Sequence, residues 1–227
     1  MDKIDLFVET GKKHTFAGAI DWPGWCRSGP DEAGALAGLL AAAPRYAAAL
    51  ATSGIDFPLP PGLDAFQVVE RLPGDANTDF GVAAKVLSSD ARPVDEAELA
   101  RYQAMLQAFW QAFDAAAAAA LGKTLRTGPR GGGRVLEKII SHVNEADLAY
   151  LAPLGCKYRP PEAASPAEQV AQLRAQALSA LAASARGEYP AFGPRGGARW
   201  TARYYVRRVA WHLLDHAWEI EDRSLAF

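Results

Sequence analysis

The sequence predicts an α+β protein in which a small β-β-β-α-β unit over residues 1–90 precedes an up-down four-helix bundle over residues 91–227. Two observations lead to this fold class. Short segments that alternate apolar and polar residues, as half-buried strands do, are confined to the first ninety residues. From Pro93 onward, apolar residues recur at spacings of three and four, which is typical of amphipathic helices.

The composition is that of a globular protein with enough chain for one large domain or two small ones. The 227 residues include 24 basic and 26 acidic side chains, so the net charge is -2. A charge so close to neutral removes the electrostatic argument for a nucleic-acid or membrane partner. No window approaches 18 uncharged apolar residues, and no signal peptide is recognised, so we expect a cytoplasmic protein.

The first unit is expected to contain strands joined by short turns and one long helix. The helix over residues 32–50 has Asp31 as its N-cap and contains Pro44. A proline-rich loop follows it. The expected strands cover residues 4–9, 14–20, 26–29 and 66–71.

Four amphipathic helices are expected in the second part. Ser165 and Glu168 have the spacing of a capping box at the start of the third. Helices of about twenty residues favour an up-down bundle, in which the second and fourth run parallel. The expected helices cover residues 95–121, 134–151, 165–185 and 200–222.

Two glycine-rich loops are nearly identical, because residues 128–134 recur as residues 193–199. Each precedes a helix, so we expect two helical hairpins with their loops at one common end. Neither loop has the pattern of a nucleotide-binding P-loop. They could bind a substrate anion at the helix N-termini, or the glycines could simply permit tight turns. The arginines of this candidate cofactor-binding end are Arg130, Arg134, Arg195 and Arg199.

Three of the four histidines fall on two of the predicted helices. His212 and His216 are four residues apart, so their side chains share one helix face. His142 lies on the inner face of the second helix, and the three imidazoles could therefore hold one divalent metal with open positions for water or substrate. One difficulty is that His142 and His212 would be offset by about 7 Å along parallel helices. The reason is that His142 lies closer to the glycine loop before its helix than His212 lies to the loop before its own helix.

Residues beside the histidines on the fourth helix complete the candidate site. Tyr205 and Arg208 would line the pocket as catalytic residues, with Arg208 available for a substrate carboxylate. Glu219 is a third catalytic candidate that could orient an imidazole, or it could be a solvated helix charge. A pair of histidines on one helix also arises by chance. Zinc suits such a site best, and nickel, iron or manganese would also be accepted.

The second part resembles the DinB-like superfamily of bacterial four-helix bundles. The residues that carry the resemblance are 140–145, around His142, and 210–223, around His212 and His216. The resemblance implies that these three histidines bind a divalent metal. It also implies a thiol-dependent transferase or isomerase activity, in which the metal activates a low-molecular-weight thiol.

Residues 15–29, followed by Asp31, Glu32 and Ala33, are similar to the HicB-like fold, in which strands lead into a helix. HicB-like units often bind a protein partner, so the resemblance implies an interaction module or a lid.

Three hypotheses about function remain open. The first is a thiol-transferase-like or hydrolase-like enzyme with a metal-bound thiol or water, which acts on an electrophilic substrate. The second is a metal-stabilised binding protein that contacts its partner through the first unit. The third is a bundle with a vestigial site that holds no ion. The chain could also form a homodimer.

Overall fold

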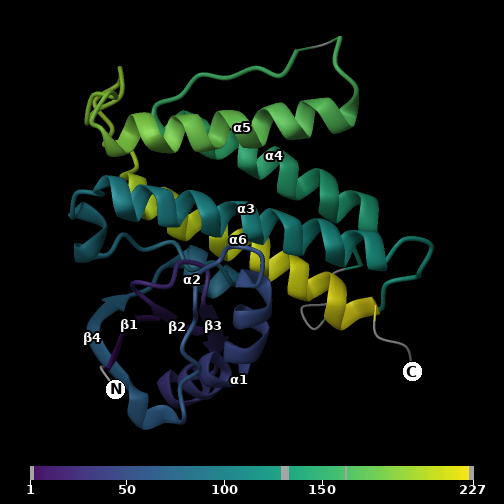
Figure 1. The fold of residues 1–227 in the computed structure, drawn as a ribbon. Coiled ribbons are helices and arrows are strands. Elements are labelled where there is room, and N and C mark those ends of the chain that lie inside the picture. Colours follow the sequence, from purple (N-terminus) through teal and green to yellow (C-terminus); the bar gives the residue numbers. More distant parts are fainter. Residues whose placement is uncertain (1–2, 129–132, 162, 225–227) are drawn as a thin grey trace. The chain divides into compact units, whose positions relative to one another are not determined.

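A computed structural model describes residues 3–128, 133–161 and 163–224. The chain divides into two compact units, Met1–Arg92 and Pro93–Phe227. The first combines a sheet with helices and the second is helical, so the protein is of the α+β class (Figure 1). The division falls two residues after the boundary expected from the sequence.

The first unit is built on a four-stranded sheet of order β3-β2-β1-β4. β1 pairs antiparallel with β2 and parallel with β4, and β2 pairs antiparallel with β3. Gly18 lies opposite Phe7, where an added Cβ would come within 2.5 Å of the Phe7 ring, so glycine permits this close pairing. The strands are β1 (Ile4–Thr10), β2 (Thr15–Ala19), β3 (Cys26–Gly29) and β4 (Phe66–Pro73).

Helix α1 (Glu32–Leu50) packs against β2 and β3. The Asp31 carboxylate accepts a hydrogen bond from the backbone N–H of Gly34, which confirms the predicted N-cap. Pro44 lies inside the helix without ending it. By length and composition alone, α1 is the one helix of the described ranges that could cross a membrane. Its buried Leu39 and Tyr46 show that it also serves as the core helix of this unit.

A short helix that the sequence did not predict, α2 (Ala76–Phe80), follows β4. Asp75 and Thr78 form a capping box at its start. Glu9 on β1 is fully buried and accepts hydrogen bonds from the Thr78 hydroxyl at 2.5 Å and from the Lys85 backbone N–H at 3.1 Å. A buried carboxylate therefore links the segment after β4 to the sheet.

The second unit contains four long helices, and α6 contacts each of the other three. Asp95 caps the first, and the Ser165–Glu168 capping box forms at the start of the third as predicted. The second continues through Pro153 and ends at Gly155, whose φ is +123°. The helices are α3 (Glu96–Ala119), α4 (Leu136–Leu154), α5 (Pro166–Ala185) and α6 (Ala202–Ser224).

The directions of these helices differ from the expected up-down order. The start of α6 meets the end of α4, because the Trp200 N–H donates to the Pro153 carbonyl. The end of α6 meets the start of α4, because Arg223 donates to the Arg134 carbonyl. Helices α4 and α6 are therefore antiparallel, and the prediction that they run parallel is wrong.

The remaining contacts complete the order as up-down-down-up (Figure 1). Arg203 near the start of α6 pairs with Glu98 near the start of α3, so these two helices are parallel. Arg186 after the end of α5 pairs with Glu96 at the start of α3, so α5 is antiparallel to α3. Helix α4 is also antiparallel to α3, because α3 runs parallel to α6, and α5 is therefore parallel to α4. The connection between α4 and α5 must span the helix length, about 30 Å, which some ten extended residues can cover.

Candidate metal centre

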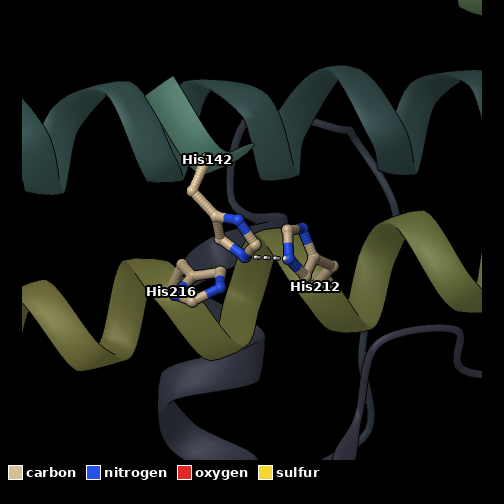
Figure 2. A group of neighbouring side chains, drawn as sticks. All are labelled: His142, His212 and His216. Atoms are coloured by element: carbon tan, nitrogen blue, oxygen red, sulfur yellow. Dashed lines mark hydrogen bonds between the residues drawn. The ribbon is translucent and has the colours of Figure 1, made fainter. Parts of the chain in front are cut away.

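The imidazoles of His142 on α4 and of His212 and His216 on α6 point toward one another (Figure 2). One possible ligand atom from each lies within 4.8 Å of the other two, and within the described residues this is the one His, Cys, Asp and Glu group with metal-binding geometry. We call these residues the histidine triad. The structure thus brings together the three side chains that the sequence proposed as ligands.

The antiparallel arrangement removes the offset that parallel helices would create. The two helix starts that follow the glycine-rich segments lie at opposite ends of the unit, because α4 begins beside the end of α6 and α6 begins beside the end of α4. The chain therefore runs from the start of α4 to His142 in one direction, and from the start of α6 to His212 in the opposite direction. His142 can face the interval between His212 and His216 without any shift of a helix.

The spacing of the triad suits a single ion. Nε2 of His142 and Nε2 of His212 are 3.2 Å apart. Two imidazole nitrogens bound to one tetrahedral zinc at about 2.0–2.1 Å are separated by about 3.3–3.4 Å. The three pairs of ring centroids are 4.6 to 5.0 Å apart, so no imidazole stands apart from the group.

Burial keeps two of the imidazoles in the form that binds a metal. His212 is 5 % exposed, and its burial, together with the neighbouring His216, lowers its pKa to about 2. Partial burial and the charge of His216 also lower the pKa of His142. Both rings are therefore neutral at neutral pH, which leaves each with a nitrogen lone pair.

Glu219 fixes the orientation of His216. The Nδ1 atom of His216 lies 2.7 Å from the Glu219 carboxylate, so Nδ1–H donates and Nε2 is left for a metal. The hydrogen bond from His216 and the guanidinium of Arg223 hold the pKa of Glu219 down at about 2. Each Glu219 oxygen is thereby engaged, one by His216 and one by Arg223. Glu219 is thus a positioning residue for the triad.

No fourth protein ligand accompanies the triad among the side chains that the structure describes. Glu145, close to His142 in sequence, is exposed and accepts a hydrogen bond from Ser141. A metal held by three imidazoles would retain coordination positions for small molecules.

Arg208 lies close to the triad on α6. Its guanidinium carbon is 4.7 Å from the centre of the Trp211 ring and 5.5 Å from that of Tyr150. The Tyr150 ring in turn lies 5.8 Å from His212. The expectation that Arg208 lines the candidate site agrees with these contacts, and Tyr150 is a neighbour that the sequence interpretation missed.

Tyr205 is not among the described contacts of the triad. It is fully buried, and burial, with Asp147 and Cys156 nearby, raises the pKa of its hydroxyl. In the described residues it makes no hydrogen bond or ring contact with a histidine. A catalytic role for Tyr205 at the triad therefore has no geometric support.

Asp147 is a buried carboxyl that the sequence interpretation did not identify. It is 2 % exposed and accepts a hydrogen bond from the Trp110 indole at 2.8 Å. Burial raises its pKa to about 7. The sequence does carry a signal for this burial, because Asp147 lies on the same helix face as the buried residues Leu136, Ile139 and Val143 of α4.

The four arginines of the predicted anion-binding end do not form one site. Arg134 lies beside the end of α6, whereas Arg199 lies beside Gly155 after α4, at the opposite end. Arg195 is exposed in the turn that precedes α6. Arg130 is outside the described residues. The prediction of a common end is wrong because it depended on the up-down helix order.

No family model matches the chain, and neither a curated protein nor a solved structure matches it.

Proposed function

We propose that residues 93–227 form a DinB-like metal-dependent enzyme of the thiol-transferase type. The observation that supports this most directly is the convergence of three imidazoles from two antiparallel helices without a fourth protein ligand in the described residues. A bound divalent ion would lower the pKa of a coordinated thiol or water and so supply a nucleophile at neutral pH. Zinc is the proposed metal, because a three-histidine set with an open position suits it.

The protein side chains have separate tasks in this proposal. His142, His212 and His216 would hold the ion, and burial of His212 keeps that ring neutral. Glu219 orients His216 through Nδ1 and is itself held by Arg223. The electrophilic co-substrate would bind against the side of the triad where Tyr150 and Arg208 lie.

The first unit is proposed to be HicB-like and to serve as an interaction module. Its four-stranded sheet with one packed helix is compatible with that assignment. A protein whose metal only stabilises the bundle remains the competing function.

Cobalt substitution separates these functions. A low-molecular-weight thiol such as 2-mercaptoethanol should give the cobalt(II) protein a thiolate-to-cobalt charge-transfer band. The band should be absent from a His216→Ala variant loaded under the same conditions. A cobalt spectrum that does not respond to thiols would contradict the thiol-transferase proposal and favour hydrolysis or a structural metal.

A further inference from the structure

Arg208 carries a positive charge that no carboxylate of the described residues balances. Its side chain is half-buried, and its Nη1 atom is fully shielded and has no hydrogen-bond partner in the described residues. Other arginines of the same helix are satisfied: Arg203 pairs with Glu98, and Arg223 with Glu219. A shielded guanidinium nitrogen without an acceptor is costly. Because the side chain is only half-buried, part of it stays open to an acceptor that binds from outside.

The surroundings hold this guanidinium in a fixed place. It lies over the rings of Trp211 and Tyr150, where cation–π attraction favours it. The Tyr150 hydroxyl accepts a hydrogen bond from the guanidinium, and Nη1 stays without an acceptor in the described residues. Arg208 and His212 are also one helical turn apart, about 6 Å along α6. An anion at Arg208 would therefore lie beside the proposed metal position.

We infer that the small molecule which binds beside the histidine triad carries a carboxylate, and that this carboxylate pairs with Arg208. The inference rests on the proposed function for the metal position and adds the class of ligand. A carboxylate fits because one negative charge balances one guanidinium, and its two oxygens match the planar donors of arginine. A phosphate would bring more charge than this one half-buried cation neutralises.

The test compares two thiols that differ only in charge. 3-Mercaptopropionate and its methyl ester are titrated into the full-length cobalt(II) protein, and the charge-transfer band gives both dissociation constants. We expect the acid to bind about tenfold more tightly or better, as a shielded charge-assisted pair permits. Arg208→Gln should remove this preference, so that the acid and the ester bind with equal dissociation constants. Arg208→Lys should retain part of it, and Arg186→Gln, an exposed change just after the end of α5, should retain all of it.

Several results would overturn the inference. Equal binding of acid and ester to the unmodified protein would do so. A preference that survives Arg208→Gln would also do so, because the carboxylate would then be chelating the metal. If neither thiol gives a band, the thiol-transferase proposal fails separately. Calorimetric titration with propionate then tests the inference. Propionate should bind to the unmodified protein and should not bind to the Arg208→Gln variant. Cobalt content and circular dichroism verify that each variant is folded, and Arg208→Lys replaces the glutamine variant if it is not.

Discussion

The imidazole of His216 and the carboxylate of Glu219 lie one helical turn apart on α6, with 2.7 Å between Nδ1 and the nearer oxygen. This contact decides which nitrogen of His216 faces the triad. Because Arg223 engages the other oxygen of Glu219, the carboxylate is held in place from both sides. The last three turns of α6 thus combine one candidate ligand with the two residues that orient it.

Glu219→Gln should weaken metal binding without abolishing it. The amide can still accept a hydrogen bond from His216, but it lacks the negative charge that strengthens this bond and holds Arg223. Loss of such an orienting partner typically costs about 10- to 100-fold in metal affinity. Competition with a chromophoric chelator would measure the change.

Glu145→Gln is the matched control, because Glu145 is also close to a triad residue in sequence but is exposed and bonded to Ser141. It should leave the affinity within about twofold of the original, as for an ordinary surface change. Equal losses of metal affinity in both variants would mean that Glu219 contributes only its negative charge, and not its hydrogen bond to His216.

Asp147 should contribute a fall in the free energy of unfolding as the pH rises from about 5 to 8. Below about pH 6.5 this contribution opposes that of the buried His212. The folded pKa of Asp147 is raised to about 7, so in this range the folded chain holds a proton that the unfolded chain has released. Asp147→Asn should reduce this dependence by at least about 1 kcal/mol over the interval. Urea unfolding at several pH values would show it.

Asp114→Asn provides the comparison for that experiment. Asp114 is a more exposed carboxylate on α3 that pairs with Arg174. Its replacement should shift stability by a similar small amount at every pH. If Asp147→Asn leaves the pH dependence unchanged, then Asp147 is ionised in the folded protein near neutrality.

His212 should produce the opposite dependence in acid when the protein is free of metal. Its folded pKa is lowered to about 2, so below about pH 6.5 the unfolded chain binds a proton that the folded chain rejects. The free energy of unfolding should therefore decline as the pH falls, by up to about 1.4 kcal/mol per pH unit for this group. His212→Asn should flatten the decline, and an unchanged slope would count against a buried neutral imidazole.

Gly155→Ala should destabilise the end of α4. Gly155 has a φ of +123°, and an added Cβ would lie 2.8 Å from both Arg199 Nη1 and Tyr189 Cγ. We expect a loss of about 2 kcal/mol or more from strain and crowding together. Gly187→Ala is the control, because its φ is +71° and the space around it is open. It should cost only about 1 kcal/mol, and equal losses would mean that crowding at Gly155 is unimportant.

The elements of this fold were predictable where short segments carry their own signals. The cap at Asp31 and the capping box of Ser165 and Glu168 form as expected, since a cap depends on residues within one turn. The short helix α2 was missed although Asp75 and Thr78 form a local capping box, because its five residues are too few to show a helical spacing of apolar residues.

The helix directions could not be obtained in the same way. The connection before Ser165 can either turn sharply or span the bundle, and its composition does not distinguish the two. The pairing of His212 with His216 follows from helix geometry alone, so these two positions were predictable. His142 was placed correctly as their partner, although the assumed parallel order was wrong. Tyr150 and Asp147 were missed because their importance depends on which helix faces them.

The most direct test of the metal site is elemental analysis of the protein, purified without a histidine tag, beside its His216→Ala variant. The proposed site predicts about one divalent ion per chain, with zinc foremost, and its near-complete loss from the variant. The variant should also melt at a somewhat lower temperature, since a ligand that binds only the folded state stabilises it. Metal content that is unchanged by His216→Ala would contradict the assignment of the triad as a metal site.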